Sequence, residues 1–147
     1  MCIRDRLVIE ALPDLHVDRR RVVSLAAAES GMSLAEVVEH AGRLRAKHLV
    51  LDDLSGRDVL SALTTVIARD PGHLVGVHAA GSNDAVQDLV LAVACGGTDK
   101  ECSAHLVSKA ANVVVGLAAD SAHGSRVQGV YEITGSADGD VTYDLKH

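Results

Sequence analysis

Two adjacent carboxylates, Asp52 and Asp53, follow a short apolar run in the stretch "HLVLDDLSGRD" (48–58). Neighbouring carboxylates at a strand end could hold a magnesium ion and orient an attacking water, which are the tasks of acidic residues in phosphoryl-transfer sites. The same stretch has a purely structural interpretation, because Asp53 or Ser55 could cap the helix that follows. The residue types leave both interpretations open.

One further side chain could share a site with these acids. His78 ends the apolar stretch "HLVGVH" (73–78), and Glu10 lies near the end of "LVIEA" (7–11). In parallel sheets, ligands bind at the carboxyl ends of the strands, so His78 could meet Asp52 and Asp53 there. His78 could equally be a hydrogen-bonded residue of the rim, and Glu10 a carboxylate without a ligand.

The elements that must position these residues alternate along the chain. Ser33-Leu-Ala-Glu36 has the pattern of a helical capping box, and Ser55, Ser82 and Thr98 are expected to begin three later helices. After residue 111 the pattern becomes that of β-strands separated by Gly- and Asp-rich turns. The strands are expected at 7–11, 20–25, 48–51, 73–78, 112–117, 127–134 and 141–145. This order predicts an α/β fold with a mostly parallel sheet flanked by helices, followed by a C-terminal antiparallel meander.

Composition excludes several function classes. The chain has 147 residues, 48% of them hydrophobic and 23% charged, which suits one globular domain. A net charge of −6, with no Phe and no Trp, argues against direct binding to nucleic acid. No run of the sequence approaches the roughly 18 apolar residues of a membrane span. The 3 cysteines form no zinc-binding spacing and no expected disulfide framework, which suits a reduced, cytosolic chain.

From Leu7 to the C-terminus, the order of motifs resembles the C-terminal half of the nucleotide-binding domain of type II/type IV secretion ATPases, closest to the tight-adherence pilus (CpaF-like) branch. In that family a strand ending in an "I-E-D" acidic box comes first. Here "VIEALPDL" (8–15) keeps Glu10 and has Ala11 in place of the following acid.

The Walker B strand of that family, "IIVGEVRG", is matched by the end of "GRLRAKHLVLDDLSG" (42–56). Asp53 takes the place of the glutamate, Ser55 replaces the arginine, and Gly56 is kept. The family's histidine box, which ends in "S-x-x-T-x-H-A", falls on "GHLVGVHAA" (72–80).

Within that box, His78 and Ala79 match and Gly76 stands at the threonine position, while the upstream "T-G-H" has become Ala68-Arg69-Asp70. The tail also follows the family's order, in the segments "AANVVVGL", "HGSRVQGVYEITG" and "DGDVTYDL". The ordered series of motifs, rather than any single one, carries the resemblance.

The resemblance implies a partial RecA-like P-loop NTPase domain over residues 7–147, with its Walker B strand near 48–56, its histidine box near 72–80 and its β tail at 112–147. It implies catalytic roles for Asp53, His78 and Glu10, nucleotide binding through Asp52, Asp53 and Gly56, and magnesium held by Asp52 and Asp53. The implied cofactors are ATP and magnesium. The implied partners are further copies in a hexamer and the inner-membrane platform proteins of a secretion or pilus machine, reached from the cytoplasm.

The phosphate-binding loop of such ATPases is missing from this sequence. No G-x-x-x-x-G-K-[ST] occurs, and the near match Gly124–Gly129 is followed by Val130-Tyr131 in an expected hairpin. The lead "MCIRDR" (1–6) resembles the translation of a sequencing-library transposon end, so an N-terminal truncation is expected; an ordinary start with a short charged lead is the alternative. By itself the chain should bind nucleotide weakly or not at all.

Four hypotheses about the function of the chain follow from these patterns. The chain is a fragment of a working motor ATPase, or of a degenerate paralogue with a structural or regulatory place in the machine. A phosphoacceptor regulatory domain also pairs acids at a strand end, but it needs a later strand ending in Asp and a Lys beyond it, which "HLVGVHAA" and "NVVVGLAA" do not offer. A purely structural oligomerisation module would need no ligand at all.

Overall fold

The computed structural model describes residues 6–10, 22–43, 46–69, 72–120 and 124–146. The chain divides into two compact units, Met1–His78 and Ala79–His147. Of the expected N-terminal lead, residues 1–5 lie outside the described residues, and Arg6 begins the first strand. The expected strand at 20–25 is described from Val22 onwards.

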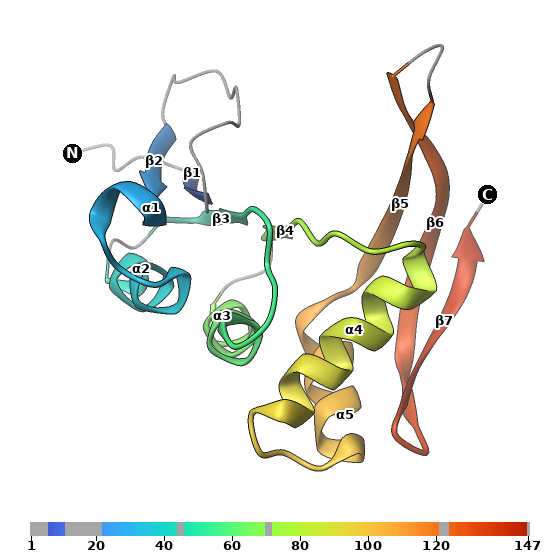
Figure 1. The fold of residues 1–147 in the computed structure, drawn as a ribbon. Coiled ribbons are helices and arrows are strands. Elements are labelled where there is room, and N and C mark those ends of the chain that lie inside the picture. The colour runs from blue at the N-terminus through green and yellow to red at the C-terminus, as the bar shows by residue number, and fades with distance from the viewer. Residues whose placement is uncertain (1–5, 11–21, 44–45, 70–71, 121–123, 147) are drawn as a thin grey trace. The chain divides into compact units, whose positions relative to one another are not determined.

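The first unit contains a parallel sheet, as the alternation of elements predicts (Figure 1). Its described strands follow the order β2-β1-β3-β4, and each neighbouring pair is parallel. The elements are β1 (Arg6–Glu10), β2 (Val22–Ala26), α1 (Ala27–Ser30), α2 (Leu34–Gly42), β3 (His48–Leu51), α3 (Asp58–Ile67) and β4 (Leu74–Val75).

Apolar residues at alternate positions of β1 and β3 form the centre of this unit. Leu7 is paired with Leu49 and Ile9 with Leu51, and all four are buried. Helices α2 and α3 pack against each other, and α2 also contacts β1. Their buried residues are spaced three and four apart, as in any amphipathic helix packed on a sheet: Leu34, Val37, Val38 and Ala41 in α2, and Val59, Ala62, Leu63 and Val66 in α3.

The expected capping box is confirmed at the start of α2. The Ser33 hydroxyl accepts the Glu36 backbone N–H at 3.3 Å, and the Glu36 carboxylate accepts the Ser33 backbone N–H at 2.8 Å. A second acid satisfies another of the free N–H groups of this helix end, because Asp58 Oδ1 accepts the Ala35 N–H at 3.2 Å. This contact ties the first turn of α3 to the first turn of α2.

The expected caps of α3 and of α4 (Ser82–Cys95) are wrong. Helix α3 begins at Asp58 after Arg57 and has no side-chain cap, so neither Asp53 nor Ser55 caps it. Ser82 is the first residue of α4 rather than its cap, which is Gly81. In both cases the first residue of the helix is not the residue that follows the expected cap.

The expected cap of α5 (Lys100–Ala110) is displaced by one residue. Asp99, rather than Thr98, caps α5 by accepting the Cys102 N–H at 2.8 Å. The Thr98 hydroxyl instead donates to the Val93 carbonyl at the end of α4. The threonine therefore closes one helix while its neighbour opens the next.

The second unit consists of two helices against an antiparallel sheet of order β5-β6-β7, which confirms the expected C-terminal meander. Asp138 and Gly139 join β6 to β7 with φ values of 53° and 77°, the geometry of a two-residue type I′ hairpin turn. Its buried apolar residues come mostly from the helices. The elements are α4 (Ser82–Cys95), α5 (Lys100–Ala110), β5 (Val113–Asp120), β6 (Gly124–Ala137) and β7 (Asp140–Lys146).

The near match to a phosphate-binding loop, Gly124–Gly129, lies within strand β6, as expected for part of a hairpin. Strand β5 leaves Val113, Val115 and Leu117 more than half exposed. No helix within the described part of the chain is both long and apolar enough to cross a bilayer.

Candidate functional site

Glu10 ends β1, and Asp52 directly follows β3, the neighbouring strand. Both acids therefore lie at the carboxyl end of the parallel sheet. Ile9 is paired with Leu51, and each acid is the next residue of its own chain segment. The Asp52 backbone N–H donates to the Ile9 carbonyl at 2.9 Å, which continues the ladder beyond the last pair. The topology therefore brings together two acids that are far apart in the sequence.

The side chain of Asp53 lies near His78. Its backbone has φ 52°, a left-handed conformation that turns the chain immediately after β3. Asp53 Oδ1 lies 3.9 Å from His78 Nε2, and the two side chains are 47% and 89% exposed. This separation exceeds a hydrogen bond, so the pair is open to solvent and to a ligand rather than closed upon itself.

The backbone after β4 holds the acidic turn in place. Gly76 donates its N–H to the Leu51 carbonyl at 2.8 Å, and its own carbonyl accepts the Leu54 N–H at 2.9 Å. The residues Asp52 and Asp53 are thus enclosed between two backbone hydrogen bonds to the same glycine. Because β3 ends at Leu51, its pairing with β4 ends at Val75. The expected strand at 73–78 is therefore reduced to Leu74–Val75.

Glu10 is buried, at 2% exposure, and its Oε1 accepts a hydrogen bond from the Ser24 hydroxyl on β2. A carboxylate in this position is held by the sheet and lies deeper than the half-exposed Asp53. Its hydrogen bond to Ser24 joins the end of β1 to β2, as expected of a buried polar group.

Gly56 lies in the loop between the acids and α3. It has φ 57°, and a Cβ atom placed on it would meet nothing within 4 Å. The glycine is therefore explained by its left-handed backbone alone, while its open surroundings leave room for a ligand. Ser55, which stands at the arginine position of the resemblance, is exposed beside it.

Among the residues that the structure describes, no group of three or more His, Cys, Asp or Glu side chains could hold a metal ion. Magnesium is commonly bound through one or two carboxylates, with waters and substrate phosphates completing its shell. Asp52 and Asp53 could supply two oxygen ligands to such a cation, with waters or a phosphate-bearing ligand completing its shell.

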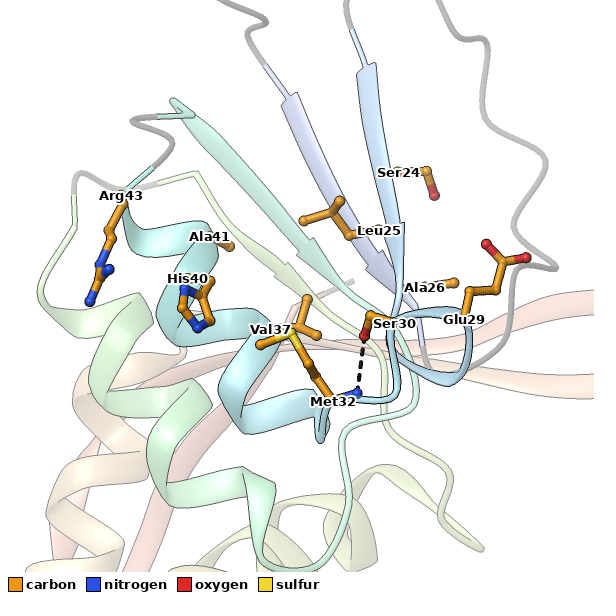
Figure 2. A pocket seen from close by; sticks show the side chains of 10 residues that line it. All are labelled: Ser24, Leu25, Ala26, Glu29, Ser30, Met32, Val37, His40, Ala41 and Arg43. Carbon is orange, nitrogen blue, oxygen red and sulfur yellow. Dashed lines mark hydrogen bonds between the residues drawn. The ribbon is translucent and has the colours of Figure 1, made fainter.

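An open pocket of about 580 Å³ lies beside the edge strand β2, and the sequence patterns do not indicate it (Figure 2). It is separated from the acids of β3 by strand β1, so it is not part of the same site. Met32 lies before the start of α2 and Arg43 directly follows its last residue. Its lining consists of Ser24, Leu25, Ala26, Glu29, Ser30, Met32, Val37, His40, Ala41 and Arg43.

The fold is shared with solved ATPases. The VirB11 ATPase from the Brucella suis type IV secretion system, in complex with sulphate, superposes with a TM-score of 0.75 at 19% identity, over 88% of this chain and 40% of its own. The ATPase DotB of Yersinia pseudotuberculosis gives a TM-score of 0.66 at 12% identity, over 88% of this chain and 35% of its own. DotB of Legionella pneumophila gives 0.61 at 12% identity, over 85% of this chain and 35% of its own.

No protein-family model and no curated protein sequence matches the chain. At these identities the likeness establishes the fold, and it confirms the predicted α/β class with a parallel sheet and an antiparallel tail. The chain spans 35% to 40% of the length of the three solved ATPases.

Proposed function

We propose that this chain is part of the nucleotide-binding domain of a motor ATPase that drives protein secretion or pilus assembly. One observation carries the proposal. On a fold similar to that of VirB11, the carboxyl edge of the parallel sheet presents Asp52, Asp53 and His78, with Asp53 Oδ1 3.9 Å from His78 Nε2. This is the edge at which α/β proteins bind their ligands.

Each residue has a role that its geometry supports. Asp53, half-exposed and turned out of the sheet, would accept the proton of the attacking water. Asp52 would provide the second carboxylate, and a bound magnesium ion would supply neutralisation of the phosphate oxygens. His78 would contact the terminal phosphate and transmit its presence to Asp53, while buried Glu10 would hold the strand ends.

The phosphate-binding loop must come from elsewhere in the parent protein, because no Walker A pattern occurs in this sequence. We propose that the parent carries it before Leu7 and acts as a homo-oligomer, a hexamer by family resemblance, on the cytoplasmic side of an inner-membrane platform. The solved VirB11 is an ATPase of a type IV secretion system, which supports a secretion-motor ATPase as the parent. The isolated chain should then show weak nucleotide binding or none.

Substitution of Asp53 in the complete parent protein tests the proposal. Asp53→Asn should lower ATP turnover by about 10²- to 10⁴-fold, the usual contribution of a general base, while ATP binding is largely kept. Asp88→Asn, an exposed carboxylate on α4, is the matched control and should leave turnover unchanged.

Unchanged turnover in the Asp53→Asn parent would remove the catalytic assignment. A wild-type parent that binds ATP without hydrolysing it would favour the degenerate paralogue with a structural or regulatory role. Asp53 is one methylene shorter than the glutamate of the resemblance, and a misplacement of about 1 Å can cost on the order of a hundredfold in rate.

A further inference from the structure

Gly76, the residue that follows β4, lies against the side chain of Asp52. A Cβ atom placed on Gly76 would come 3.1 Å from Asp52 Oδ1, closer than an ordinary van der Waals contact. Gly76 is not one of the glycines with a positive φ, so its backbone conformation does not require glycine. A side chain at this position would instead require the Asp52 carboxylate to move by a few tenths of an ångström.

The backbone cannot relieve this contact easily. Gly76 is held by hydrogen bonds on both sides, through its N–H to the Leu51 carbonyl at 2.8 Å and through its carbonyl to the Leu54 N–H at 2.9 Å. A side chain added at position 76 would therefore have to displace the carboxylate rather than the strand.

In the motifs of the secretion ATPases, the glycine and the polar residue exchange places at these two positions. "IIVGEVRG" has glycine at the position of Asp52, and the histidine box has threonine at the position of Gly76. In this chain the polar group at the edge comes from the residue after β3 instead of the residue after β4, and it is a carboxylate instead of a hydroxyl.

We infer that Gly76 is the positioning residue for Asp52: its missing side chain lets the Asp52 carboxylate lie over the end of β4, beside Asp53. The positions of the two residues do not depend on the proposed function. The consequence for ligand binding does rest on it, because it concerns a phosphate-bearing ligand at this edge.

That consequence is a stricter dependence on a divalent cation. Two consecutive carboxylates repel a phosphate, and the exposed His78 side chain lies 3.9 Å from Asp53. A hydroxyl in place of the Asp52 carboxylate would remove one of the two negative charges. The edge should therefore accept a nucleotide as its divalent-cation complex and reject the free anion.

The first test measures the position of the Asp52 carboxylate in the whole chain, by the ¹³C chemical shift of its carboxyl carbon at fixed pH. Gly76→Ala should shift the Asp52 signal and leave that of exposed Asp88 unchanged. Gly81→Ala is the matched control, because its added Cβ would lie 3.4 Å from Asp84 Oδ2, an ordinary contact. It should leave the Asp52 signal in place.

A double-mutant cycle in urea covers the case in which Gly76→Ala folds poorly. In the Asp52→Ala background, Gly76→Ala should lower the folded-to-unfolded ratio far less than it does in the wild-type chain, because the contact is gone. An unchanged Asp52 signal, or an equal cost of Gly76→Ala in both backgrounds, would overturn the inference.

The third measurement separates this inference from the proposed function. Mn²⁺ alone, added as a paramagnetic probe, should broaden the Asp52 and Asp53 carboxyl signals, and Gly76→Ala should require about tenfold more Mn²⁺ for the same broadening. Broadening at the wild-type concentration in Gly76→Ala would overturn the positioning role. No broadening in the wild-type chain, together with a shifted Asp52 signal in Gly76→Ala, would count against the proposed function and still support the position of Asp52.

Discussion

Asp53 combines an unusual backbone conformation with an exposed functional group. A left-handed φ of 52° is uncommon outside glycine, and Asp and Asn tolerate it better than other side chains do. Asn is therefore the suitable replacement for testing catalysis, since it removes the charge and keeps the backbone preference. Loss of activity in Asp53→Asn would then report on the carboxylate rather than on the turn.

Glu10 depends on Ser24 in a way that a stability measurement can detect. Ser24→Ala removes the hydroxyl that donates to the buried Glu10 carboxylate, and loss of a hydrogen bond to a charged group costs about 1.5–3 kcal/mol. We expect the free energy of unfolding in urea to fall by an amount in that range.

The matched control for Ser24 is Ser108, whose hydroxyl donates only to the His105 carbonyl of its own helix among the contacts described. Ser108→Ala should change the unfolding free energy by less than about 0.5 kcal/mol. If both serine variants behave alike, Ser24 does not support Glu10.

At the level of single residues, the sequence predicts the location of the site better than its geometry. Asp52 and Asp53 could be assigned to a strand end from the apolar run that precedes them. His78 was expected to end a strand, but β4 ends at Val75, so His78 lies in the segment after it. The left-handed turn at Asp53 and the contact between Asp52 and Gly76 could not be predicted, because both depend on where β4 lies against the end of β3.

Helix α2 offers a test at the scale of the element. Ser33→Ala removes the hydroxyl that accepts the Glu36 N–H, and the loss of a serine N-cap should lower the unfolding free energy by about 1 kcal/mol. Ser55→Ala is the control, since Ser55 does not cap α3 and is exposed, and it should be nearly neutral. An equal effect of the two substitutions would contradict the described caps.

The same capping box predicts the direction of a pH effect. Hydrogen bonds from Ser33, first from its backbone N–H and then from its hydroxyl, lower the pKa of Glu36. Because the pKa is lower in the folded state, this contribution is present above the unfolded-state pKa and is lost as pH falls through the folded-state pKa. The advantage of the wild-type chain over Glu36→Gln in urea unfolding should therefore shrink on acidification, and an advantage that grows would contradict this assignment.

Element types were more predictable than element ends. Periodicity and the turn-rich segments predicted most helices and strands of both units, whereas the short helix α1 was not expected. The starts of α3, α4 and α5 were displaced because several polar residues near each start could cap equally well from sequence, and tertiary contacts decide among them. Asp58, for example, bonds to the start of α2 instead of serving its own helix.

At the scale of the molecule, the division into two units predicts independent folding of residues 79–147. This unit has its own buried centre, in which Val90 and Val93 of α4, Val107 of α5 and Val141 of β7 are covered. The isolated segment should give a dispersed ¹H–¹⁵N NMR spectrum whose peaks overlay those of the same residues in the whole chain. A collapsed spectrum would show that this unit needs the first one in order to fold.

Long-read sequencing of the locus upstream of the codon for Leu7 tests whether Asp52 and Asp53 form half of a nucleotide site. We expect an in-frame G-x-x-x-x-G-K-[ST] loop on a strand-to-helix turn, because this sequence contains no such phosphate-binding loop. A stop codon there, or a loop without its lysine, would contradict this expectation and leave Asp52 and Asp53 as parts of a structural subunit.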